Sequence, residues 1–199
     1  MKKIFVILSM LITLVTVQAQ EKKFVMRLQG GYAFANGHKD AALDDGANIK
    51  LSLDERIPES KSWFAGLGAQ YLRSSFLDLP TAGDAPSDLY AFVVRAGWQT
   101  QLFCDDLALW FALEGGSGLM QSRHQYDGMR YRLKRGTAVG GFEIGLDYRL
   151  TDTFGLSLAW SATRFGNDNL QHGSVAASLP KPSIFSTSAL NAGLSITLK

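Results

Sequence analysis

Bulky apolar residues alternate with polar residues and glycines along most of the chain after residue 23. The pattern is clearest in the segment 137–165, where one set of alternate positions holds Phe142, Ile144, Leu146, Tyr148 and Leu150. The positions between them hold Gly141, Glu143, Gly145, Asp147 and Arg149. A period of two is typical of a β-strand whose two faces meet different environments. A second alternating arm begins at Phe154, so this segment predicts a β-hairpin.

The same alternation predicts eight strands, at residues 24–34, 47–57, 63–74, 89–103, 107–120, 137–150, 154–165 and 187–199. Polar, turn-rich stretches at 36–46, 75–88, 121–135 and 166–186 predict long loops, while 58–62, 104–106 and 151–153 predict short turns. The alternative for 121–135 is that its end extends the strand that follows. Strands of about 9–11 residues with long loops at one end and short turns at the other are typical of transmembrane barrels.

The beginning of the chain differs from the rest. Lys2 and Lys3 precede an apolar run at 4–17, and Val17-Gln18-Ala19 resembles a cleavage site. We therefore expect a secretory signal peptide at 1–19, with an uncleaved membrane anchor as the alternative, and one domain at 20–199. The single cysteine excludes an intrachain disulfide. The expected fold is all-β: an eight-stranded antiparallel up-and-down transmembrane β-barrel with short periplasmic turns and long extracellular loops.

Most charged residues within the strands fall on the face opposite the bulky apolar one. This expected inward set is Arg27, Lys50, Asp54, Arg56, Arg95, Glu114, Glu143, Asp147 and Arg149, and Trp110 shares its parity. The charges that break the rule, Glu55, Arg73 and Arg164, lie near strand ends. A barrel of eight strands is filled by its own side chains, so these charges predict internal salt bridges. A narrow ion path or proton relay is the functional alternative.

Aromatic residues predict two belts at the membrane interfaces. The periplasmic belt would contain Phe24, Trp63, Phe103, Tyr148 and Phe154, and the outer one Tyr32, Phe34, Tyr71, Tyr90, Phe92 and Phe165. Trp98 and Trp160 would face lipid at a deeper level.

Basic residues are concentrated in the expected 121–135 loop, with Asp127 as their one acidic neighbour. They are Arg123, His124, Arg130, Arg132, Lys134 and Arg135. A patch of this kind suits an anionic partner such as lipopolysaccharide phosphates or acidic glycans. The alternative is a solvated loop that complements an anionic membrane surface.

Candidate enzyme and metal chemistry is sparse. His172-Gly173-Ser174 resembles the His-x-Ser pair of the lipid A deacylases, which are also eight-stranded barrels, but Val175 follows where that family has asparagine. No acid follows Asp168 to orient a histidine. Asp40, Asp44 and Asp45 lack a defined calcium-binding pattern, and the three histidines lie in separate loops. We expect no catalytic residues, no metal, no cofactor and no nucleic-acid partner.

On this alternation and loop pattern, residues 21–199 resemble the small eight-stranded outer-membrane β-barrel proteins, the class of the OmpX-, Ail- and OmpA-type barrels. The chain departs from many of them by ending in Leu198-Lys199 and not in an aromatic residue. The resemblance implies an integral outer-membrane protein, in contact with lipid and lipopolysaccharide and folded by the outer-membrane assembly machinery. We expect a non-enzymatic role in envelope structure, or adhesion or interaction with a surface protein or glycan. The alternatives are a small porin-like channel, a lipid A-modifying enzyme and a soluble periplasmic lipocalin-like barrel.

Overall fold

The computed structural model describes residues 24–36, 45–58, 60, 62–76, 85–102, 105–126, 129–167 and 185–198. Eight strands account for nearly all of them. They are β1 (Phe24–Asn36), β2 (Gly46–Arg56), β3 (Trp63–Phe76), β4 (Ala85–Leu102), β5 (Leu107–Tyr126), β6 (Met129–Arg149), β7 (Phe154–Asn167) and β8 (Phe185–Leu198). The expected signal peptide lies outside the described residues.

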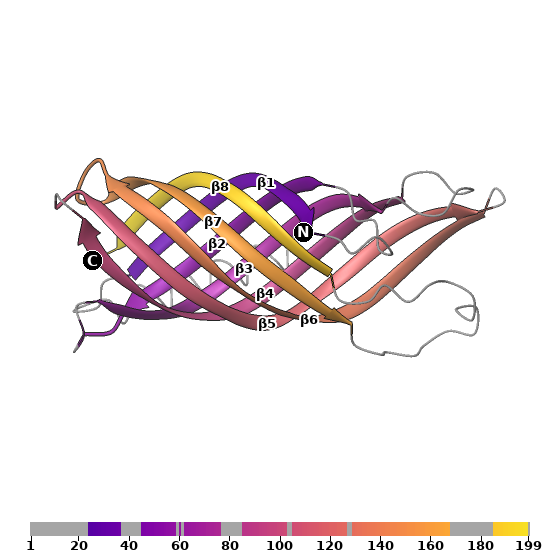
Figure 1. The fold of residues 1–199 in the computed structure, drawn as a ribbon, viewed down its shortest axis with the longest axis horizontal. Helices are drawn as coiled ribbons and strands as arrows, with labels where there is room; N and C mark the ends of the chain where they lie inside the picture. The colour runs from indigo at the N-terminus through magenta and orange to yellow at the C-terminus, as the bar shows by residue number, and fades with distance from the viewer. Residues whose placement is uncertain are drawn as a thin grey trace.

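The strands form a closed antiparallel barrel in which each strand pairs with its neighbours in sequence. β1 closes the sheet on β8, with Phe24 opposite Leu198. Figure 1 shows the strands inclined to the long axis, as barrel closure requires. The short β2–β3, β4–β5 and β6–β7 connections share the end at which β1 begins and β8 ends. The expected eight-stranded fold is therefore confirmed.

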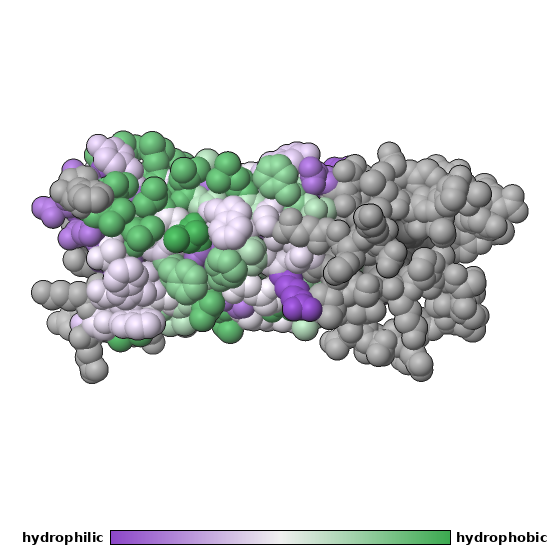
Figure 2. Space-filling view, in the orientation of Figure 1, coloured by the Kyte–Doolittle hydropathy of each residue, from purple (hydrophilic) through white to green (hydrophobic). Residues whose placement is uncertain are grey.

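The outer face is apolar in a broad band. Leu28, Leu67, Phe92, Val94 and Leu113 are each more than half exposed, although large apolar side chains are normally buried. Figure 2 shows hydrophobic residues gathered over the barrel wall on the face in view. Within the described residues, no helix is long and apolar enough to cross a membrane.

The segment 121–135 is a correction to the sequence prediction. Its described residues form strands and not a loop: β5 continues to Tyr126 and β6 begins at Met129, with Gln121 opposite Lys134 and Tyr126 opposite Met129. The alternative that the end of the segment extends the following strand is therefore confirmed. Figure 1 shows this hairpin extending well beyond the other strands. A strand outside the bilayer needs no apolar face. The polar composition of this segment therefore gave no alternation from which a strand could be predicted.

Smaller corrections concern the second loop and three aromatic residues. β4 begins at Ala85, and Ser75 pairs with Pro86 inside the stretch expected to be a loop. Trp98 is the register partner of Trp63, at the short-turn end, so it belongs to the periplasmic belt and not deeper in the membrane. Phe165 is fully buried inside the barrel and is not in the outer belt. Phe24, at the start of β1, is also largely buried.

Candidate functional site: a filled barrel interior

Seven of the nine expected inward charges meet in one buried network, which we call the charged layer. It consists of Arg27, Lys50, Asp54, Arg95, Glu114, Glu143 and Asp147, each less than a tenth exposed. Arg27 on β1 pairs with Asp54 on the adjacent β2 and, across the interior, with Asp147 on β6. Its Nε donates to Asp147 Oδ2 over 2.9 Å.

The other two cations link further strands. Lys50 Nζ on β2 lies 2.8 Å from Glu114 on β5 and 2.9 Å from Glu143 on β6. Arg95 on β4 lies 3.2 Å from Glu143 and 3.2 Å from Asp54. Most of these bonds cross the barrel, so the charged layer ties opposite walls together. Water-excluded ion pairs need several such partners to offset their desolvation.

The structure explains why Trp110, a large aromatic residue of β5, has inward parity. Its ring lies 4.4 Å from the Arg27 guanidinium carbon and 5.4 Å from that of Arg95. Its Nε1–H donates to Asp147 Oδ1 over 3.2 Å. The ring also lies against its register partner Gly145, where a Cβ would meet ring atoms of Trp110. The indole is thus part of the charged layer.

Next along the barrel is an uncharged polar layer. Gln70 donates to Asn48 over 2.9 Å, and Asn48 donates to Asn191 over 2.8 Å. Asn48 and Asn191 lie on strands separated by β1, and Gly31 stands between them as the register partner of both. A Cβ at Gly31 would meet Asn191, so the missing side chain permits the amides to bond.

Toward the long-loop end the interior becomes apolar, whereas the sequence pattern predicts a polar interior. The apolar layer consists of Ala33, Leu72, Leu89, Ala91, Val93, Met120, Val139, Phe165 and Ala189, all buried. The order repeats along individual strands: on β1, Arg27 is followed by Gln29 and then Ala33. For three residues of the apolar layer, the inward parity was visible in the sequence. These are Leu72, Leu89 and Val93, at the outer ends of β3 and β4.

The two remaining inward charges line a cavity of about 890 Å³ at the short-turn end. Arg56 is half-buried there, and Asp147 also lines the cavity. Arg149 is exposed at the rim and pairs with Asp106 over 2.8 Å. Both arginines are therefore separate from the charged layer, apart from the cavity they share with Asp147.

The basic residues of the expected third loop belong to the projecting hairpin. Arg123 and Arg132 are register partners, Arg130 lies opposite Gln125, and Lys134 is exposed. His124 and Arg135 lie opposite Tyr131 and Met120. Asp45 Oδ1 accepts the backbone N–H of Ala35.

The His172-Gly173-Ser174 stretch and the loop residues His38, Asp40 and Asp44 lie outside the described residues. Among the residues that are described, no group of three His, Cys, Asp or Glu side chains is placed to hold a metal.

An apolar exterior around an interior that contains buried ion pairs and amide hydrogen bonds is the inverse of a soluble protein. A closed barrel also leaves no backbone group unpaired at a sheet edge, which a bilayer requires. These features define the class of integral membrane β-barrels and oppose the lipocalin-like alternative, which needs an apolar lumen throughout. The sequence pattern of the outer membrane protein beta-barrel domain matches residues 5–195, so the chain belongs to this family of outer-membrane proteins.

Two solved structures agree with this fold. Neisserial surface protein A superposes with a TM-score of 0.56 at 15% identity, over 87% of this chain and 96% of that one. A major outer membrane protein from Thermus thermophilus gives a TM-score of 0.59 at 10% identity, over 90% of this chain and 100% of that one. The attachment invasion locus protein Ail of Yersinia pestis gives 0.47 at 11% identity, over 87% and 97%. A search of curated proteins found no significant match.

Proposed function

We propose that this outer-membrane protein is a non-enzymatic surface interaction protein, exported by the signal peptide at 1–19 and integrated in the membrane after cleavage. Its filled barrel is the stem, and the β5–β6 hairpin is the interaction surface outside the cell. One observation carries the proposal. The pairing of β5 with β4 ends at Ser122, and the pairing of β6 with β7 begins at Thr137. Beyond these points the described strands pair only with each other.

The chemistry of the hairpin favours an anionic partner. Its register brings Arg123 opposite Arg132, and Lys134 lies exposed nearer the barrel. Strand edges outside the barrel also leave backbone N–H and C=O groups that another chain can pair with. An acidic surface protein or glycan therefore suits this hairpin better than a neutral partner.

The filled interior argues against the channel alternative. The charged layer and the apolar layer both cross the barrel, and their side chains are almost wholly buried. We expect no steady conductance from the purified protein in planar bilayers. A reproducible single-channel current would favour the porin-like function instead.

Photo-crosslinking in cells tests the interaction directly. A photoreactive amino acid replaces Tyr126 or Arg130 on the hairpin, and adducts are identified by mass spectrometry. The matched control places it at Val94, which is exposed on the band of the barrel wall that we assign to the bilayer. We expect a discrete protein or glycan adduct from the hairpin positions and none of that mass from Val94. Lipopolysaccharide alone, or no adduct, would contradict the proposal and favour a purely structural barrel.

A further inference from the structure

The outer aromatic belt of the barrel is incomplete. On β1, β3 and β4 it consists of Tyr32, Phe34, Tyr71, Tyr90 and Phe92. Toward the same end, the outward positions of β5–β8 include the small register partners Gly115 and Gly140, Ser117 and Ala138, and Ala162 and Ser188, but also the bulky Leu119, the register partner of Tyr90. Aromatic belts anchor barrels at the membrane–water interface. The half of the circumference formed by β5–β8 therefore lacks this aromatic anchor at the outer interface.

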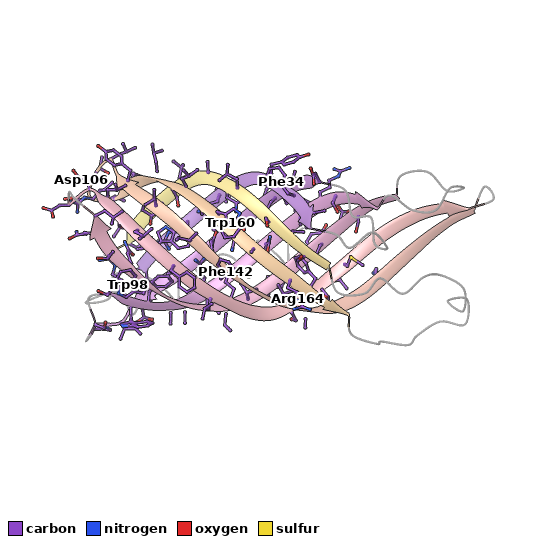
Figure 3. The ribbon with its side chains drawn as sticks, viewed as in Figure 1. Phe34, Trp98, Asp106, Phe142, Trp160 and Arg164 are labelled. Atoms are coloured by element: carbon purple, nitrogen blue, oxygen red, sulfur yellow. The ribbon has the colours of Figure 1, made fainter. Side chains whose placement is uncertain are left out.

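Arg164 lies in the middle of this half. It is exposed on β7, between the register partners Gly140 on β6 and Ser186 on β8. Figure 3 shows it toward the long-loop end, beyond Phe142 and Trp160. Those two rings pack edge to face with centroids 5.4 Å apart and form the apolar border on the side of the membrane centre.

The charge of Arg164 is uncompensated within the described residues. No ion pair or hydrogen bond joins it to them, and none of the described outward positions of β5–β8 holds an acid. Arg73, on the belted half, provides the contrast. It is the register partner of Asp88, which in turn accepts a hydrogen bond from the Tyr71 hydroxyl over 2.8 Å.

From this contrast we propose that the outward face of β5–β8 around Arg164 binds a phosphorylated lipid A molecule of the outer leaflet. The Arg164 guanidinium contacts a lipid phosphate, because arginine binds phosphate through paired, charge-assisted hydrogen bonds. An acyl chain lies over Gly140 and Ala162 and against the Phe142–Trp160 pair. The small residues leave room that an aromatic belt would fill.

A second copy of this chain suits the same face less well. A twofold interface centred on this face would bring two Arg164 side chains together with no acid from β5–β8 to separate them. The long-loop end also faces the leaflet in which phosphorylated lipid A resides. The charge of Arg164 therefore favours an anionic lipid over a second copy of this chain.

Native mass spectrometry of the purified protein in detergent tests the site, with bis-phosphorylated lipid A as the probe. We expect a one-to-one adduct that is reduced roughly tenfold by Arg164→Ala, as for a lost charged hydrogen bond, and largely kept by Arg164→Lys. The matched control is Arg73→Ala, which removes an exposed arginine whose register partner is an acid, Asp88, and should leave the adduct unchanged. Dephosphorylated lipid A should bind the wild-type protein as weakly as lipid A binds Arg164→Ala.

A second variant tests the acyl-chain face without touching the charge. A Cβ at Gly140 would meet only a backbone oxygen at 3.9 Å, so Gly140→Phe should fold and fill the space. We expect it to weaken the lipid A adduct with Arg164 intact. Equal binding of phosphatidylglycerol would overturn lipid A as the occupant in favour of a general phospholipid headgroup. A dimer in place of the adduct, or equal lipid A loss in Arg164→Ala and Arg73→Ala, would also overturn the proposal.

Discussion

The charged layer and the apolar layer fill the same barrel by opposite means. In the charged layer, each side chain depends on partners from other strands, as Arg27 depends on Asp54 and Asp147. In the apolar layer, Leu72, Val93 and Phe165 are held by many weak contacts, none of which requires a particular partner. The charged layer therefore specifies which strand faces which, while the apolar layer closes the long-loop end and tolerates change.

The largest expected effect comes from removing one cation of the charged layer. Arg27→Met leaves Asp54 and Asp147 buried without this partner and removes the cation that lies closest to the Trp110 ring. Breaking a buried ion pair from one side costs about 3–5 kcal/mol. We expect a loss of this size in urea unfolding of the protein in phospholipid vesicles.

The combined variant Arg27→Met, Asp54→Asn, Asp147→Asn separates charge from packing. Removing the charges together leaves no unpaired ion, so it should be more stable than Arg27→Met alone. If the single and combined variants unfold at the same urea concentration, the pairing of charges is not what the layer contributes.

A cavity in the apolar layer should cost less and depend only on volume. Leu72→Ala removes a nearly fully buried side chain, and we expect a loss of about 2–4 kcal/mol. The control Leu72→Met nearly conserves volume and should cost less than about 1.5 kcal/mol. The same unfolding assay measures both. A Leu72→Met protein as unstable as Leu72→Ala would mean that this layer also demands specific partners.

A smaller effect is expected where the charged layer relies on a missing side chain. Gly145→Ala places a methyl group against the Trp110 ring, which must then move away from Asp147. Overpacking of this kind costs about 1–3 kcal/mol. Gly140→Ala is the matched control, because its Cβ has only an ordinary contact with a backbone oxygen. Near-ultraviolet circular dichroism should change for Gly145→Ala and not for Gly140→Ala.

Alternation was enough to predict the barrel, its strand number and the inward position of Trp110. The membrane imposes one rule on every transmembrane strand, so a local pattern carries global information there. The same rule gave no information beyond the membrane. Gln121–Tyr126 continues β5 without an apolar face, and only its pairing with β6 reveals a strand.

The sequence predicted which charged residues face the interior, but not how these residues pair with one another. Parity placed Lys50, Glu114 and Glu143 inside, yet nothing local specifies that Lys50 reaches both acids across the barrel. The apolar layer was missed for a different reason. Leu89 and Val93 have inward parity in the sequence, but the prediction of a polar interior gave no reason to expect an apolar layer. Phe165 was assigned to the outer belt.

The ion pair at the periplasmic rim should show the smallest effect and sets the baseline for the comparison. Arg149 donates to Asp106 through both Nε and Nη2, over 3.0 and 2.8 Å, a geometry as good as that of Arg27. Both side chains are about half exposed, so water competes for each charge in the unpaired state. We expect Arg149→Ala to leave the urea midpoint unchanged, at low and at high salt, in the assay that resolves Arg27→Met. If Arg149→Ala destabilised the protein as much as Arg27→Met, geometry and not burial would explain the cost of losing an arginine. The contrast between the interior layers would then not depend on the exclusion of water.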